Sequence, residues 1–166
     1  MSGIIGTVGA RSGIVGQTQS GSGLQSSFNV KLSANQDNIA SGVTILFNTL
    51  QAPNIGGDFN TSTYTYTAPV TGMYTFLVNA YQENVDNVHN YSRAILQTSN
   101  RGYGGSIFDT RVWSGSCWLF GQNIGVLTEM EAGDIAFVYH NYSGGTSTTD
   151  YSSASFFSGY FTGITY

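Results

Sequence analysis

Charged side chains are scarce in this chain. Lys, Arg, Asp and Glu make up 8% of its 166 residues, and the formal net charge at pH 7 is −4, whereas an average soluble domain is roughly 25% charged. Only five residues are Lys or Arg, and they are scattered along the sequence. Since no basic stripe can neutralise a run of phosphates, we expect no nucleic-acid binding and no electrostatic membrane anchor.

Cysteine and long apolar runs are also lacking. The one cysteine, Cys117, excludes an intramolecular disulfide and a cysteine-rich zinc site. It lies in the apolar sequence Cys117-Trp118-Leu119-Phe120, and we expect a buried structural thiol. No window reaches the roughly 18 apolar residues of a membrane helix, and residues 1–9 lack the features of a signal peptide. We therefore expect no membrane insertion and no secretory leader.

Motifs for catalysis and metal binding are missing as well. The sequence has no Gly-x-Ser-x-Gly elbow, no His-Glu-x-x-His motif and no Gly-x-x-x-x-Gly-Lys loop. His140 closes an expected strand, His89 lies in a polar stretch, and Glu129 and Glu131 precede a turn-like Gly-Asp. A pair of Cys117 with either histidine is the one nucleophilic arrangement left open. We predict a protein that is not an enzyme and has no metal ion and no cofactor.

Alternation of apolar and polar residues is the dominant pattern. The two prolines, Pro53 and Pro69, lie outside the alternating segments, and no segment has a 3.6-residue apolar repeat. Short alternating segments with Gly-, Asn-, Ser- and Asp-rich turns favour an all-β sandwich or barrel. The pattern predicts strands near residues 28–32, 43–47, 63–67, 73–81, 91–98, 116–121, 123–130, 134–141 and 154–165.

Two of these segments, 73–81 and 156–166, carry large side chains on both faces. A sandwich strand needs only one apolar face, so another subunit is the expected cover for the second face. The candidate subunit-interface residues are Leu77, Tyr81, Phe156, Tyr160 and Ile164.

Composition changes near residue 27. Residues 1–26 are rich in Gly, Ser and Gln, but their glycine spacing slips and no proline is present, so they do not form a collagen helix. A flexible linker is one interpretation. A linker needs no apolar residues, however, and we predict an anchoring arm over residues 1–26 ahead of one domain over residues 27–166. The apolar residues of this arm are Ile4, Ile5, Val8, Ile14 and Val15.

Four aromatic residues lie in or beside loop-like sequence. They are Tyr103, Trp113, Tyr142 and Tyr151. Aromatic rings beside Arg, Ser, Gly and Asn suit contacts with sugars or proteins, so these four are the candidate ligand-binding residues. The alternative is that they pack on the sandwich or across a subunit interface.

The segment Tyr66-Thr-Ala-Pro-Val-Thr-Gly-Met-Tyr-Thr-Phe76 resembles the Phe-x-Ala-Pro-x-x-Gly-x-Tyr-x-Phe signature of complement C1q-like domains. Glu131-Ala-Gly-Asp134 resembles the acidic turn of that family, and Phe157-Ser-Gly-Tyr-Phe161 its closing strand. The resemblance covers about residues 27–166. It implies an all-β, ten-stranded jelly-roll sandwich, shared with the tumour necrosis factor superfamily, that forms homotrimers with an N-terminal stalk. The carboxylates of this chain are isolated, so no calcium site is implied.

Residues 2–16 resemble short Gly/Ile/Val segments in structural proteins of tailed bacteriophages, and C1q-like tips occur on phage fibres. Together these resemblances predict a structural or adhesion protein of the virion, on the capsid surface or the tail. Its trimeric knob or fibre tip would be anchored to other virion proteins through residues 1–26, and its loops would contact a host cell-surface glycan or protein. The alternative is an extracellular, cytokine-like or bacterial C1q-like ligand-binding domain with no virion role.

Overall fold

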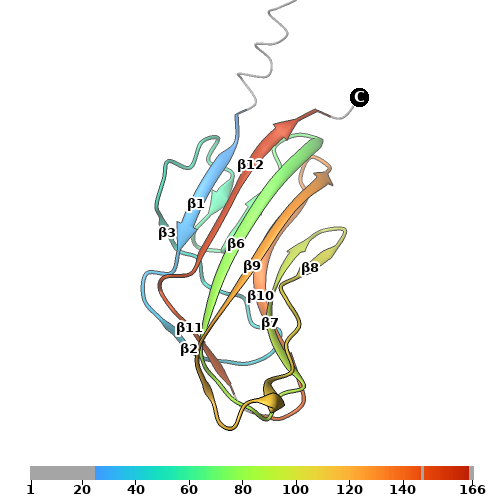
Figure 1. Ribbon diagram of the computed structural model, residues 1–166. Coiled ribbons are helices and arrows are strands. Elements are labelled where there is room, and N and C mark those ends of the chain that lie inside the picture. The colour runs from blue at the N-terminus through green and yellow to red at the C-terminus, as the bar shows by residue number, and fades with distance from the viewer. Residues whose placement is uncertain (1–24, 147, 165–166) are drawn as a thin grey trace, which may run out of the picture.

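The computed structural model describes residues 25–146 and 148–164, which form two antiparallel β-sheets packed face to face (Figure 1). The described residues contain one helical element, the 3₁₀ turn η1 (Thr110–Val112). The seven-stranded sheet comprises β1 (Ser27–Lys31), β2 (Gln36–Ile39), β3 (Thr49–Leu50), β6 (Gly72–Val85), β9 (Cys117–Met130), β11 (Thr149–Tyr151) and β12 (Phe156–Gly163). The five-stranded sheet comprises β4 (Phe59–Asn60), β5 (Thr65–Thr67), β7 (Tyr91–Thr98), β8 (Gly102–Gly104) and β10 (Ile135–Ser143). The predicted all-β sandwich is confirmed.

Strand β6 organises the seven-stranded sheet. One of its edges pairs with β12 and, further along, with β11, while its other edge pairs with β9. From β12 the sheet continues to β1 and β3, and from β11 to β2. In the five-stranded sheet the order is β4-β5-β10-β7-β8.

The two ends of the sandwich differ in what they carry. Strand β1 begins where β12 ends, since Ser27 pairs with Tyr160, so both ends of the described chain lie at one end of the sandwich (Figure 1). Three loops, one of which contains η1, lie at the opposite end (Figure 1). We call this end the loop tip, and it is formed by residues 86–90, 105–116 and 144–146.

Period-two sequence produces the core. In β6, Tyr74, Phe76, Val78 and Ala80 all point inward and are buried, as the pattern predicts. They belong to one core cluster with Phe28, whose ring centroid lies 4.7 Å from that of Phe59, 4.8 Å from that of Phe157 and 5.0 Å from that of Tyr66. Burial of each large apolar side chain contributes about 1.5–3 kcal/mol, so this aromatic cluster holds the two sheets together.

The signature segment after β5 makes a corner. The Tyr74 hydroxyl donates to the Val70 carbonyl at 2.6 Å, which closes the turn that follows Pro69. The Tyr66 hydroxyl lies 2.7 Å from Ser26 Oγ, and Ser26 donates in turn to an Asp58 carboxylate oxygen at 2.6 Å. Burial raises the pKa of Tyr66, so its hydroxyl remains a donor and ties the start of β1 to β5.

The acidic turn between β9 and β10 also forms as expected. Asp134 accepts a hydrogen bond from the Glu131 amide at 2.9 Å, and Gly133 has a φ of 92°, a conformation that favours glycine. Glu131 is therefore a turn residue, as predicted, whereas Glu129 lies near the end of β9.

Three details differ from the sequence prediction. Residues 43–47 form only an isolated bridge, because the chain changes sheets there: Ile45 donates to β10 at Val138, while Asn48 donates to β1 at Lys31. The predicted break at residue 122 is wrong, since β9 is continuous. The short strands β2, β3, β4, β8 and β11 were not expected, and the described residues contain twelve strands rather than ten.

Candidate functional site

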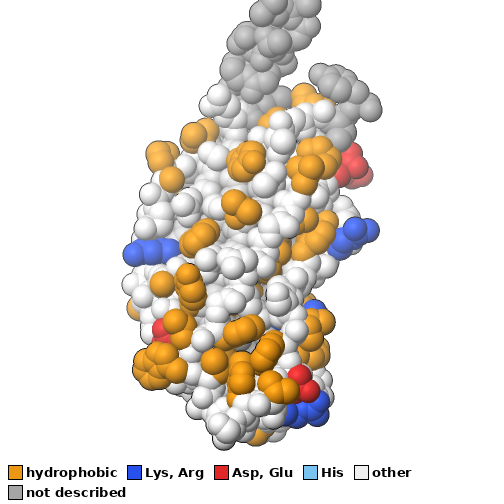
Figure 2. Space-filling view, in the orientation of Figure 1, with side chains coloured by type: hydrophobic (Ala, Val, Ile, Leu, Met, Phe, Trp, Pro, Cys, Tyr) orange, Lys and Arg blue, Asp and Glu red, His pale blue; other side chains and the backbone are white. Residues whose placement is uncertain are grey.

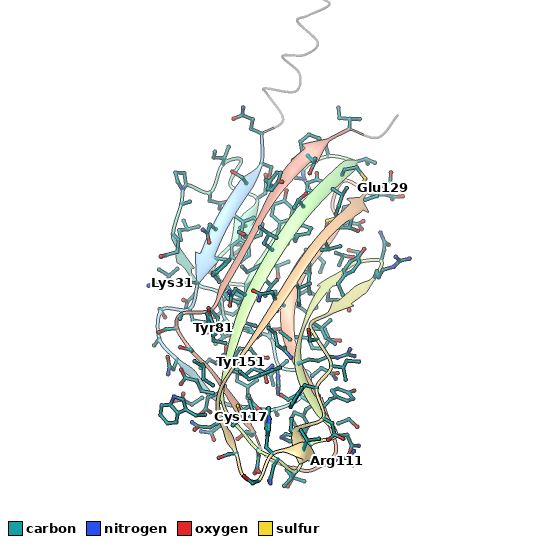
Figure 3. The ribbon with its side chains drawn as sticks, in the orientation of Figure 1. Lys31, Tyr81, Arg111, Cys117, Glu129 and Tyr151 are labelled. Carbon is teal, nitrogen blue, oxygen red and sulfur yellow. The ribbon has the colours of Figure 1, made fainter. Side chains whose placement is uncertain are left out.

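The outer face of the seven-stranded sheet is unusually apolar. We call it the apolar sheet face, formed by Leu77, Tyr81, Leu119, Leu127, Phe156 and Tyr160. Leu77 is 48% exposed, Leu127 57% and Tyr160 48%. Figure 2 views this side of the molecule and shows apolar side chains spread over it, with the few charged groups at its margins. Lys31 and Glu129 lie at opposite margins (Figure 3).

Two glycines make this face flat. Gly121 lies opposite Tyr81 and Gly125 lies opposite Leu77 in the β6–β9 register. A Cβ at Gly121 would lie 3.2 Å from the Tyr81 ring, and one at Gly125 would lie 3.4 Å from Leu77 Cδ2. The side chains of β6 therefore lie over bare backbone of β9. A flat apolar face of this kind suits packing against another protein surface.

The five interface candidates from the sequence fall close together. Leu77, Tyr81, Phe156 and Tyr160 share the apolar sheet face, and Ile164 is exposed just beyond the end of β12. The sequence prediction missed Leu119 and Leu127. The outward-facing positions of β9 between Leu119 and Leu127 are Gly121, Asn123 and Gly125, so the sequence of this strand gave little sign of an apolar outer face.

The loop tip carries a second group of exposed apolar residues. Rings of Phe108, Trp113 and Phe120 form its base, with centroids 4.8 Å apart for Phe108–Trp113 and 5.4 Å for Phe108–Phe120. Trp118, two residues before Phe120 in β9, is 77% exposed, and Val112 is 69% exposed. The tip also has a polar pocket of about 440 Å³ lined by Asn84, Asp86, Ser116 and Thr148.

The loop tip contains an ion pair between Arg111 and Asp109. Arg111 donates to both carboxylate oxygens of Asp109, at 2.9 and 2.8 Å, and both side chains are solvent-accessible. The hydrogen bonds from the Arg111 side chain and amide lower the pKa of Asp109 to about 2. The pair consequently stays ionised and adds no net charge to the tip.

The structure does not gather the four ligand-binding candidates into one site. Trp113 lies in the loop tip, and Tyr142 packs on His89 with ring centroids 4.3 Å apart. Tyr103 lies on β8, where it donates to Thr128 at 2.8 Å and lines a separate pocket of about 310 Å³. Tyr151 is 0% exposed, so the expectation of a surface residue there is corrected. The exposed Trp118 was not among the candidates.

Tyr151 belongs to a buried polar network that the sequence did not reveal. Its hydroxyl accepts from Gln82 Nε2 at 3.1 Å and lies 2.9 Å from His140 Nδ1. Gln82 Nε2 also lies 3.1 Å from Gln122 Oε1, and Ser92 donates to Gln82 Oε1 at 2.7 Å. Burial, together with the neighbouring His89, lowers the pKa of His140 to about 4. His140 is therefore neutral and has a structural position inside β10.

Cys117 is a second correction. It is partly exposed rather than buried, and its thiol donates to the Leu119 carbonyl at 3.4 Å. Both histidines are buried.

Within residues 25–146 and 148–164, no three His, Cys, Asp or Glu side chains are grouped closely enough to hold a metal ion. No helix in the part of the chain that the structure describes is long and apolar enough to cross a bilayer.

Comparison with known proteins identifies the architecture. The sequence profile described as "C1q domain" matches residues 27–162. The globular domain of zebrafish complement 1qA protein superposes with a TM-score of 0.63 at 14% identity, covering 85% of this chain and 99% of that chain.

Two tumour necrosis factor relatives superpose as well. Eiger TNF from S. frugiperda gives a TM-score of 0.56 at 11% identity over 86% of this chain and 94% of its own. Murine APRIL gives 0.52 at 9% identity over 83% of this chain and 99% of its own. At these identities the likeness concerns the fold, and it confirms the predicted jelly-roll sandwich. No curated protein matches the chain at a significant level.

Proposed function

Because the chain belongs to the C1q domain family, we propose that it is a homotrimeric, non-enzymatic binding module. The apolar sheet face packs against two further copies, and the loop tip, at the opposite end of the sandwich from the start of β1, contacts a ligand. One observation carries the proposal: a flat face with Leu77, Leu127 and Tyr160 roughly half exposed in the single chain. Covering such side chains would stabilise an assembly by about 1.5–3 kcal/mol for each one buried.

The assembly is tested by placing a charge on the apolar sheet face. Leu77→Glu should yield a folded monomer, because a carboxylate buried without a partner costs several kcal/mol. Val112→Glu is the matched control, since Val112 is also apolar and exposed but lies at the loop tip. The proposal predicts that sedimentation velocity separates the two variants. An unchanged oligomeric state in Leu77→Glu would contradict it.

The ligand contact is tested at the loop tip. The double change Trp113→Ala and Trp118→Ala should abolish binding to a host cell or isolated receptor without changing the solution mass. Retained binding would place the ligand elsewhere on the molecule.

We further propose a role in a virion, with residues 1–26 as the arm that docks the knob onto other virion proteins. This part of the proposal is supported by the Gly/Ile/Val sequence of the arm. Residues 1–24 of the arm lie outside the described residues. Deleting residues 2–16 should leave a soluble trimer that no longer joins the particle. Normal incorporation of the deleted form would remove the anchor, and an absence of this protein from particles would favour an extracellular binding domain instead.

A further inference from the structure

The outer face of the five-stranded sheet lies on the side of the sandwich away from the apolar sheet face. Arg93 is the one charged residue among Lys, Arg, Asp and Glu in strands β4, β5, β7, β8 and β10. Arginine is almost never fully buried unless it is paired, and Arg93 is partly buried. Within the described residues the one ion pair is Arg111–Asp109, so no ion pair between Arg93 and a carboxylate is formed within those residues.

Three neighbours hold the Arg93 guanidinium flat on the sheet. Its central carbon lies 5.1 Å from the centroid of the Tyr91 ring, and its Nε donates to Asn141 Oδ1 at 3.4 Å. On the other side it lies over Gly104, where a Cβ would be only 2.7 Å from Nη1. Nη1 and Nη2 donate to no described atom. The two terminal nitrogens that match the oxygens of a carboxylate are thus oriented and unused.

Aromatic rings and amides continue this face along β10. Tyr139 and Phe137 precede Asn141 in β10 at two-residue spacing and lie on the same face. Their ring centroids are 6.1 Å apart. Gln97 pairs with Phe137 across to β7. These four side chains are half-buried, so part of each remains accessible. We call the surface of Tyr91, Arg93, Gln97, Phe137, Tyr139 and Asn141 the Arg93 face.

The chemistry of the Arg93 face fits a sugar that bears a carboxylate. Aromatic rings pack against the apolar C–H face of a pyranose, side-chain amides exchange hydrogen bonds with its hydroxyls, and an unused guanidinium fork pairs with a carboxylate. We propose that the Arg93 face binds acidic glycans, with Arg93 contacting the carboxylate of a uronate or sialate residue. The net charge of −4 provides no general attraction for polyanions, so binding depends on these local contacts.

The site lies within one chain and is independent of the loop tip and of assembly. The test uses the full-length protein and two ligand pairs that differ only in the carboxylate: trigalacturonate against its methyl ester, and 3′-sialyllactose against its methyl ester. Titration calorimetry should show binding of at least one acidic member, and its neutral counterpart should bind at least about tenfold more weakly, as expected for loss of a charge-assisted hydrogen bond. The pair that responds identifies the sugar.

Three variants connect the binding to Arg93. Arg93→Gln should weaken binding at least about tenfold. Arg101→Gln removes the same charge from an exposed arginine outside the Arg93 face and should bind as the unmodified protein does. Gly104→Ala should also weaken binding, because the added methyl displaces Nη1.

Three results would overturn the proposal: no binding of either acidic sugar, equal binding of the neutral counterparts, or unchanged binding by Arg93→Gln. Solution mass and thermal denaturation of the variants are measured in parallel. A trimer that fails to bind these sugars refutes the glycan site alone, whereas a monomer that binds them refutes the assembly alone.

Discussion

Gly159 in the closing strand is a position where an added methyl group should disrupt the packing of the core. It is buried on β12, between Phe28 on β1 and Phe76 on β6 in the strand register. A Cβ there would lie 2.5 Å from Phe76 Cδ1 and 2.8 Å from Phe28 Cε1. Both rings are packed in the aromatic cluster, so neither can move aside as the end of a flexible side chain would.

Gly159→Ala should therefore destabilise the protein by overpacking, at a cost of about 1–3 kcal/mol. For a chain of this size, that corresponds to a fall in Tm of roughly 2–12 °C. Urea unfolding measures the change, with all variants at one protomer concentration because assembly adds to apparent stability. Gly163→Ala is the matched control on the same strand, since its Cβ would meet no atom within 4 Å. Equal stability of the two variants would refute the packing argument.

Three further changes test the buried network and the loop tip. Tyr151→Phe should destabilise the fold by about 1–3 kcal/mol in urea unfolding, because Gln82 and His140 lose a buried partner; an unchanged midpoint would contradict the network. Since the pKa of His140 falls from 6.5 to about 4 on folding, the unfolded chain binds a proton between those values that the folded chain does not. Stability should consequently drop as pH falls from about 6.5 to 4, by at most about 3 kcal/mol, and His140→Gln should flatten that slope; a slope equal to that of the unmodified protein would exclude His140 as its source. Asp109→Asn should leave the urea midpoint at pH 7 unchanged, because its ion pair is exposed, and a clear loss would mean that the pair orders the tip.

Apolar–polar alternation predicted the sandwich correctly in strands whose backbone stays in one sheet. In β6 and β12, alternation identified Phe76 and Phe157 as core and Leu77 and Tyr160 as the outer face. Alternation also predicted a strand over residues 43–47, and this was wrong. Ile45 and Phe47 are both buried, but the backbone around them passes from one sheet to the other. Side-chain period alone contains no information about which strand accepts the backbone hydrogen bonds.

The candidate sites were predictable only where a single segment contains the signal. A strand with two apolar faces indicated Leu77 and Tyr160 directly. Tyr151 was misjudged because its partners, Gln82 and His140, come from other strands. Arg93 was overlooked for the same reason, since its environment is assembled from β7, β8 and β10 only in the folded chain.

The apolar sheet face is tested most directly by the mass of the full-length protein in solution, measured by sedimentation equilibrium. The chain has a mass of 17.7 kDa, and closed threefold assembly predicts one discrete species of about 53 kDa. A stable, soluble 17.7 kDa species at micromolar concentration would contradict the account, because the half-exposed leucines and tyrosines of that face would then have no partner.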